Sequence, residues 1–170
     1  MNTKFEFTKV LKVKSPTRGT AKSAGIDFFI PENTEEFIAQ LSQKNGSNIS
    51  ITENTIIIHS HKDVLIPSGI HCKIPENTML TAANKSGVAT KHKLVYGAHI
   101  LDEDYQGQFH LHLINTSNDN VSLSFGQKIL QAIIVPVYYS DIIEHESIDK
   151  LYENHNSDRG SGGFGSTGIY

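Results

Sequence analysis

Apolar and polar residues alternate with a period of two through most of the chain. β-Branched and aromatic residues dominate the alternating segments, and Pro, Gly, Asn and Asp separate them. The clearest segments are residues 64–66, 69–74, 108–114 and 129–137. Most intervals between them are too short for a helix, so the pattern predicts a compact all-β sandwich or barrel rather than alternating βαβ units.

Two stretches depart from this alternation. Residues 34–46 begin with a capping threonine and an acidic first turn, carry apolar residues on one face and end at Asn-Gly, which predicts a short helix. A strand is expected to follow at residues 55–59. Residues 141–152 are expected to contain one or two further helical turns.

Composition is that of an ordinary globular protein, and 170 residues with 38% hydrophobic and 19% charged residues predict one domain. The net charge of −3 argues against direct nucleic-acid binding, because such proteins are normally basic. The single cysteine, Cys72, cannot form an intrachain disulfide. No apolar run has membrane-spanning length, and the first ten residues carry too many charges for a signal peptide. We therefore expect a cytoplasmic protein without membrane contact.

Glycine and hydroxyl residues crowd the segment from Arg159 to Tyr170. Five glycines in the nine positions 160–168 leave the backbone free to expose its N–H groups, which together with an arginine suit a phosphate. Phe164 among them is typical of a ring that stacks on a flat ligand such as a base. Taken alone, the segment is also compatible with a disordered Gly/Ser tail or a linker, which we consider the less favoured interpretation.

Two short polar clusters precede apolar runs. Residues 23–28 (SAGIDF) lead through small residues to an aspartate, although a turn before a strand explains them better. Residues 84–89 (NKSGVA) combine a cation, a hydroxyl and a glycine. They suit either a helix whose N-terminus faces an anion or a plain helix cap.

Two further clusters interrupt or flank predicted strands. Residues 101–108 (LDEDYQGQ) place three carboxylates close together, which a metal, a basic partner or full solvation makes tolerable. Within the apolar run 125–137, the amide of Gln131 needs hydrogen-bond partners if it is buried. From the residues alone, we favour the neighbouring backbone over a ligand as that partner.

In chain order, the segments AGID, NKSGVA, GAHILDEDYQG, GQKILQ and RGSGGFGSTG resemble the five motifs of the homotrimeric all-β dUTPases, the deoxyuridine triphosphate diphosphatases. They cover the chain from about Ser23 to Gly168. The resemblance implies a compact β-barrel or jelly-roll-like domain at residues 1–158 and a flexible arm at 159–170 that closes over the active site. It also implies a homotrimer with sites shared between three subunits.

The resemblance assigns roles to individual residues. Asp102 matches the catalytic aspartate that activates the attacking water, and Tyr105 the ring that lies under the deoxyribose and rejects a 2′-hydroxyl. Asp27 matches the aspartate that supports Mg²⁺ through water. The residues matched to other substrate contacts are Lys85, Ser86, Gly87, Gly97, Ala98, Gln131, Arg159, Gly163, Phe164, Gly165, Ser166 and Thr167. In the family, the tail residues grip the γ-phosphate and cap the uracil, and Gln131 and the second motif contact phosphates.

The implied reaction is the hydrolysis of dUTP to dUMP and pyrophosphate, which keeps uracil out of DNA and supplies dUMP for thymidylate synthesis. In-line attack of water on the α-phosphorus needs a base that orients the water and neutralisation of the departing pyrophosphate. Mg²⁺, held mainly by the substrate phosphates, and Arg159 are expected to supply that neutralisation.

Several positions depart from the common family pattern. Lys85 replaces the usual arginine and keeps its charge without its bidentate fork. Asn84 stands where proline is common. His99 and Tyr96 replace glycine and asparagine in the hairpin whose backbone reads uracil in the family. Residues 33–62 lengthen the interval between the first two motifs, and we interpret them as an insertion that thickens the trimer or offers a surface to a protein partner.

The nine histidines include the i, i+2 pairs His59/His61 and His110/His112. Such pairs share one face of a strand, as some zinc ligands do. Alternating strand positions explain the spacing without a metal, and no cysteine or carboxylate cluster completes a site. We therefore expect no histidine metal site.

Two other functions are compatible with the same fold. A dCTP deaminase, alone or combined with triphosphate hydrolysis, would need an acid/base glutamate, and Glu103 is the only glutamate of the third motif. Release of ammonia from dCTP would identify that activity. A regulator that binds a protein partner through residues 34–62 is the other alternative. The presence of Asp102, Gln131 and Arg159 argues against a loss of catalysis.

Overall fold

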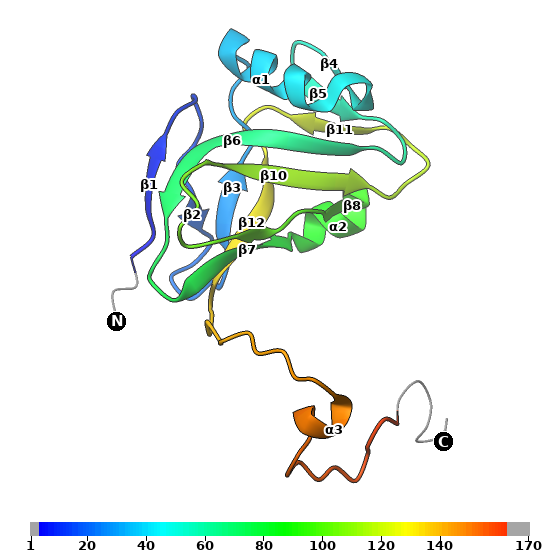
Figure 1. The fold of residues 1–170 in the computed structure, drawn as a ribbon. Helices are drawn as coiled ribbons and strands as arrows, with labels where there is room; N and C mark the ends of the chain where they lie inside the picture. Colours follow the sequence, from blue (N-terminus) through cyan, green and yellow to red (C-terminus); the bar gives the residue numbers. More distant parts are fainter. Residues whose placement is uncertain (1–3, 163–170) are drawn as a thin grey trace. The chain divides into compact units, whose positions relative to one another are not determined.

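The computed structural model describes residues 4–162 (Figure 1). The chain divides into two compact units, residues 1–138 and 139–170. Every strand of the described residues lies in the first unit, and the second contains one short helix. The second unit thus begins before residue 159, where the resemblance places the start of the arm. Closure of that arm over the site stays a prediction.

The first unit is built mainly from strands. These are β1 (Glu6–Lys9), β2 (Thr17–Arg18), β3 (Ile26–Phe29), β4 (Ile49–Ile51), β5 (Thr55–Ile58), β6 (Asp63–Lys73), β7 (Thr78–Asn84), β8 (Leu94–Tyr96), β9 (Ile100–Leu101), β10 (Gln108–Asn115), β11 (Val121–Ser124) and β12 (Lys128–Pro136). The helical segments are α1 (Glu35–Asn45), the 3₁₀ helix η1 (Gly46–Asn48), α2 (Ser86–His92) and, in the second unit, α3 (Ile148–Leu151).

The strands pair into three sheets, with the orders β1-β6-β10-β8, β11-β5-β4 and β2-β3-β12-β7-β9. In Figure 1, β6 and β10 run side by side across the first unit, with α1, β4 and β5 beyond one edge and β7 and β12 beyond the other. β12 is the central strand of the largest sheet and pairs antiparallel with both β3 and β7. Three segments that are far apart in the sequence therefore lie next to one another.

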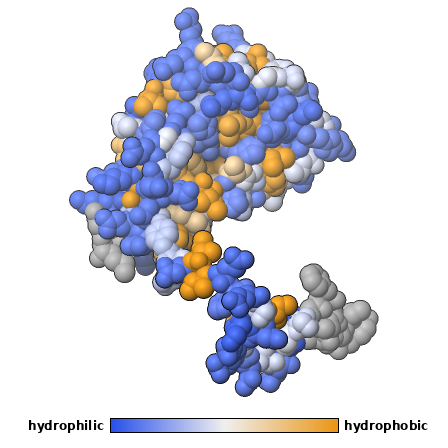
Figure 2. Space-filling model, in the orientation of Figure 1, coloured by the Kyte–Doolittle hydropathy of each residue, from blue (hydrophilic) through white to orange (hydrophobic). Residues whose placement is uncertain are grey.

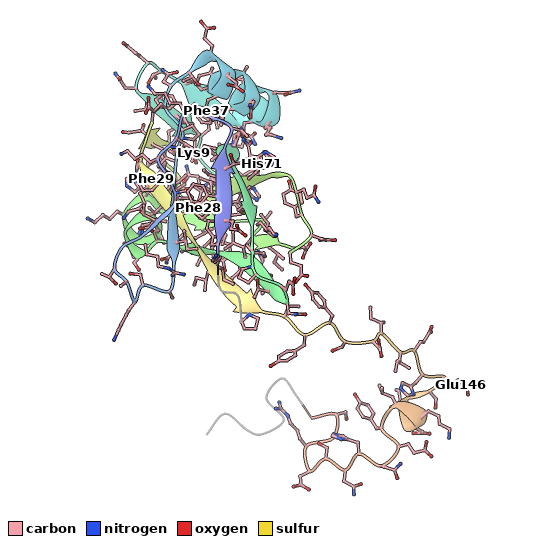
Figure 3. All side chains as sticks on the ribbon, turned by 90° about the vertical axis from the view of Figure 1, so that its left-hand side faces the viewer. Lys9, Phe28, Phe29, Phe37, His71 and Glu146 are labelled. Atoms are coloured by element: carbon pink, nitrogen blue, oxygen red, sulfur yellow. The ribbon has the colours of Figure 1, made fainter. Side chains whose placement is uncertain are left out.

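Alternation along the strands buries one side chain in two. In β10 the pattern is regular, with Phe109, Leu111 and Leu113 buried and the residues between them only partly covered. The inward side chains of the three sheets and of α1 form one hydrophobic core. Phe28 lies within it (Figure 3), and its ring is edge-on to that of Phe109. The outer surface of the unit is mostly hydrophilic in the view of Figure 2, as the hydrophobic effect requires.

The helix α1 begins and ends where the sequence predicts. Thr34 caps it by accepting a hydrogen bond from the backbone N–H of Phe37. Gly46 follows with a φ of +49°, and its N–H donates to the carbonyl oxygen of Ser42. The apolar face buries Phe37 and Leu41 completely. Packing of this face against β6 attaches residues 33–62 to the sheet rather than leaving them as a loop.

The all-β prediction is confirmed. The predicted strands correspond to β6, β10, β12 and β5, and the helical turn expected within residues 141–152 is α3. Within residues 4–162 the pairing yields three sheets without a closed barrel. No helix of this described part is long and apolar enough to cross a membrane.

Candidate active site

A buried carboxylate between two lysines lies in the middle of the largest sheet. Asp27, on β3, is only 4% exposed. The Nζ atom of Lys85 lies 2.5 Å from its Oδ1, and that of Lys128 lies 2.8 Å from its Oδ2. Two ammonium groups around one carboxylate leave an excess of positive charge, which suits an anionic ligand better than a cation.

Burial of Asp27 by itself would raise the pKa of its carboxyl group, because desolvation penalises the charged form. Hydrogen bonds from Lys128 and Lys85, together with their positive charges, outweigh this effect and hold the pKa below its usual range. The carboxylate is therefore ionised at neutral pH.

Gln131 lies beside this cluster, since it is paired with Asp27 across β12 and β3. Its Nε2 donates to the carbonyl oxygen of Asn84, 2.8 Å away, so the backbone is the partner that the sequence analysis favoured. Gly25 is buried against the same amide, and a Cβ atom there would clash with the Oε1 of Gln131. The glycine of the first motif thus makes room for the glutamine of the fourth.

The second motif forms the start of α2. Lys85 is the N-cap residue. Its side chain makes no capping hydrogen bond and instead donates to the carboxylate of Asp27. Ser86 and Gly87 follow in the first turn and are exposed. A Cβ atom on Gly87 would meet nothing within 4 Å. Packing within the chain therefore does not explain this glycine, whereas it does explain Gly25.

The third motif lines a pocket of about 260 Å³. Asp102 follows β9 and is exposed at this pocket, together with Tyr105, which is 46% exposed. The backbone N–H of Tyr105 donates to the carbonyl oxygen of Asp102. The hydroxyl group of Tyr105 donates to the carbonyl oxygen of Gln108. A Cβ atom on Gly107 would clash with the Tyr105 ring, so this glycine lets the ring fold back over the loop.

The turn before β9 is held by a histidine of β10. The backbone N–H of Gly97 donates to the carbonyl oxygen of His112 at 3.0 Å, and that of Ala98 donates to its Nδ1 at 2.7 Å. These are the two residues assigned to reading the base. In this structure both of their N–H groups already have partners within the chain.

Comparison with known proteins decides the family, because a model of the dUTPase family matches residues 37–168. The chain belongs to the dUTPase family. It is 32% identical to the deoxyuridine 5′-triphosphate nucleotidohydrolase of Arabidopsis thaliana, over 96% of this chain and 84% of the relative. It is 31% identical to that of Candida albicans, over 97% of this chain and 92% of the relative. The family predicted from the five motifs is confirmed.

Solved structures show the same fold. A dUTPase of Staphylococcus bacteriophage 80alpha, solved with dUpNHpp, aligns with a TM-score of 0.73 and 20% identity over 99% of this chain and all of that one. A mutant dUTPase from phage phi11 of S. aureus aligns with a TM-score of 0.62 and 17% identity over 86% of this chain and 99% of that one. The phi11 structure describes the coordination of a structural Mg(II) ion.

Within one subunit of this dUTPase, the two clusters lie apart. Asp27, Gln131 and Ala83 form one row across the sheet. Leu101 pairs with Leu80 at the far edge, so Asp102 comes opposite the next position of β7. With strands about 4.8 Å apart and a rise of about 3.3 Å per residue, Asp102 lies about 20 Å from Asp27. That separation exceeds the length of a triphosphate.

The remaining predicted residues belong to the second unit. Arg159 has its Nε donating to the carbonyl oxygen of Gly162 at 2.7 Å. Gly163, Phe164, Gly165, Ser166 and Thr167 lie outside the described residues. The structure thus brings the first, second and fourth motifs together in one cluster and places the third at a separate pocket.

Three residues of these clusters were missed in the sequence. In the sequence, Lys128 lies within the GQKILQ motif without a predicted role, and His112 is considered only as a metal ligand. Asp63, which accepts a hydrogen bond from His112, was not singled out. The sequence shows a lysine at the start of the apolar run and histidines at alternate strand positions. Neither feature indicates which strand pairs with the one that carries it.

The ion cluster predicts an acid-dependent loss of stability. We expect Asp27→Asn to lower the free energy of unfolding by about 2 kcal/mol at pH 7, because it leaves two lysines without their counter-charge. A carboxyl group with a lowered folded-state pKa stabilises the protein above its unfolded pKa of about 4, and that contribution disappears as pH falls through the folded-state value. The difference between the two proteins should therefore shrink below about pH 4.

Urea unfolding of the wild type and of Asp27→Asn at a fixed protein concentration measures this difference in the free energy of unfolding. Measurements from about pH 3 to about pH 8 bracket the unfolded-state pKa of about 4. Asp119→Asn is the control, because Asp119 is an exposed carboxylate outside the cluster. If Asp27→Asn lowered the free energy of unfolding equally at all pH values, the negative charge of Asp27 would not be the source of its stabilising effect.

Proposed function

We propose that this dUTPase hydrolyses dUTP to dUMP and pyrophosphate. The observation that carries the proposal is the exposed carboxylate of Asp102 beside the ring of Tyr105 on one pocket. In this position Asp102 can accept a proton from a water molecule as the water oxygen bonds to the α-phosphorus. The bond from that phosphorus to the departing pyrophosphate breaks on the opposite side.

The Asp27–Lys85–Lys128 cluster supports a phosphate-binding role for the second motif. Its excess of positive charge attracts the triphosphate, and the exposed Ser86 and Gly87 start the adjoining helix. Gln131 adds an amide whose position is fixed by its hydrogen bond to Asn84. Gripping of the γ-phosphate by Arg159, Ser166 and Thr167, and capping of the uracil by Phe164, stay predictions.

Discrimination against ribonucleotides is assigned to Tyr105. Its hydroxyl is tied to the carbonyl oxygen of Gln108, and Gly107 allows the ring to lie close to the loop. A ring fixed in this way can pack under a deoxyribose and leave no space for a 2′-hydroxyl. The proposal therefore includes rejection of UTP.

Mg²⁺ is the metal we propose, held mainly by the substrate phosphates. No three His, Cys, Asp or Glu residues come together among residues 4–162 in a way that could hold a metal. Both oxygens of Asp27 accept lysine hydrogen bonds, so its predicted support of Mg²⁺ through water fits this chain poorly. When bound, the ion would neutralise charge on the pyrophosphate.

We propose that the active form is a closed homotrimer whose sites are shared between subunits. The separation of about 20 Å between Asp102 and Asp27, obtained from strand spacing, supports this proposal, because one triphosphate bound to one subunit would not span both clusters. Large apolar side chains are also exposed in the second unit, and a further copy of the chain would cover them. They include Ile142, Ile143, Ile148, Leu151 and Tyr152.

The alternative functions receive less support. Glu103, which a deaminase would need as acid/base, accepts a hydrogen bond from the backbone N–H of Asn77. A protein partner at residues 33–62 stays a prediction. Phage 80alpha dUTPases are described as controlling the transfer of virulence genes by a proto-oncogenic G protein-like mechanism, and their likeness to this chain concerns the fold. A cytoplasmic location likewise stays an expectation.

Asp102→Asn tests the chemistry. We expect the wild-type protein to release pyrophosphate from dUTP in preference to dTTP, dCTP and UTP. The variant should bind dUTP nearly as well but turn it over at least about a hundredfold more slowly, because an amide cannot accept the proton. Pyrophosphate release and calorimetric binding of a non-hydrolysable analogue measure the two effects. Near-normal turnover by the folded variant would remove Asp102 from the mechanism.

Gly87→Ala tests the phosphate site without disturbing the fold. Because a Cβ atom there meets nothing in the chain, the free energy of unfolding should stay the same or rise by less than about 1 kcal/mol. The KM for dUTP should rise about tenfold, since the methyl group occupies the approach to the backbone N–H. Lys91→Ala, at an exposed position of the same helix, is the control. An unchanged KM would contradict phosphate binding at this turn.

Mixed trimers test the shared sites. Asp102→Asn subunits and Gln131→Ala subunits should each be nearly inactive alone. Co-expressed with two different tags and purified as mixed trimers, they should recover activity, because about a third of the sites (one in each mixed trimer) would receive both intact residues. Each variant co-expressed with itself gives the baseline. Mixed trimers that stay at this baseline would show that each site lies within one subunit.

A further inference from the structure

The turn at residues 97–98, which forms part of the wall of the third-motif pocket, rests on the side chain of His112. Its two backbone N–H groups both donate to this one residue, one to the main-chain oxygen and one to the ring. The contact is so close that a Cβ atom on Gly97 would overlap the imidazole. The position of the ring therefore sets the position of the turn.

Hydrogen-bond partners determine the protonation of the ring. Nδ1 of His112 accepts from the N–H of Ala98, so it carries no proton. Nε2 then carries the proton and donates to Oδ2 of Asp63 at 2.9 Å. The other oxygen of Asp63 accepts from Nδ2 of Asn48, also at 2.9 Å. Asn48 ends the 3₁₀ helix η1 of the insertion, so an unbroken set of contacts connects the insertion with the pocket.

A second asparagine of the insertion, Asn45, binds the backbone of strand β6 next to these contacts. Asn45 is buried, its Oδ1 accepts from the N–H of Leu65 at 2.7 Å, and its Nδ2 donates to the carbonyl oxygen of Leu65 at 3.0 Å. Leu65 lies directly across from His112 in the β6–β10 pair, and both residues line the pocket. Two side chains of the insertion thus hold the strand and the carboxylate on which the ring depends.

We propose that His112 is a positioning residue for base recognition, and that Asp63 and Asn48 make its position depend on the insertion. The proposal rests on the dUTP hydrolysis proposed above. The neutral ring of His112 fixes the position of the turn at residues 97–98 in the wall of the pocket. That position determines the size of the base that the pocket admits. Movement of η1 releases Asp63, and the ring and the turn follow. Residues 33–62 thereby acquire a role in substrate selection.

Two substitutions of His112 separate its two hydrogen bonds. In His112→Asn, the amide oxygen can stand where Nδ1 stands and still accept from Ala98, but the contact with Asp63 is lost. In His112→Gln, the longer amide can reach Asp63, but the acceptor for Ala98 is lost. We expect His112→Gln to raise the KM for dUTP about tenfold, the scale of one lost hydrogen bond, with kcat within about twofold of the wild type. His112→Asn should stay within about threefold in KM.

The preference for dUTP over dTTP, whose base is larger by one methyl group, as the ratio of kcat/KM values, should fall in His112→Gln and be largely kept in His112→Asn. Asn48→Ala should raise the KM in the same direction by a smaller factor. Asn33→Ala is the matched control, because Asn33 also belongs to the insertion but donates to Glu53 instead. Equal kinetics for the two His112 variants, or an effect on kcat alone, would overturn the proposal.

The amide resonance of Ala98 in ¹⁵N-alanine-labelled protein gives a readout that does not depend on catalysis. It should shift strongly in His112→Gln and little in His112→Asn. If the wild-type protein failed to hydrolyse dUTP while this difference appeared, the proposed function would fall and the positioning contact would stand. If His112→Gln did not fold, Asn48→Ala against Asn33→Ala would decide, and identical KM values and Ala98 shifts for that pair would overturn the coupling to the insertion.

Discussion

The strand β12 needs hydrogen-bond partners along both edges, because a buried strand cannot leave its backbone groups unpaired. β3 and β7 supply them, and the registers place Asp27 and Ala83 on either side of Gln131. The first, second and fourth motifs are thereby drawn into one cluster. Lys85, which follows β7, and Lys128, which opens β12, then meet at the carboxylate of Asp27. The excess of positive charge around Asp27 follows from this pairing.

The elements α1, β5, β6, β10 and β12 could be predicted from the sequence because their causes are local. Alternation marks β10 and β12, and Thr34 with Gly46 marks both ends of α1. The partners of polar side chains could not be predicted in the same way. Asp27 and Lys128 meet only because of one register among many, and nothing near His112 in the sequence points to Asp63. Periodicity tells which face a residue occupies but not which strand lies beside it.

Glycines in this chain divide by the contacts that a side chain would make. Gly25 and Gly107 lie against Gln131 and Tyr105, so they serve the internal packing of the motifs. Gly87 faces open space, so no contact within the subunit requires its lack of a side chain. Sequence alone does not separate these cases, since each glycine occurs within a family motif. Only the packed structure shows which ones are required by the fold.

The overlap between Gly97 and His112 links two positions that are distant in the sequence. A methyl group at position 97 would fit only beside a side chain smaller than histidine. A smaller side chain at position 112 would lose the donor that reaches Asp63, and it would hold Ala98 only if it kept an acceptor where Nδ1 stands. A side chain at position 97 is therefore compatible with this turn only when the side chain at position 112 is smaller.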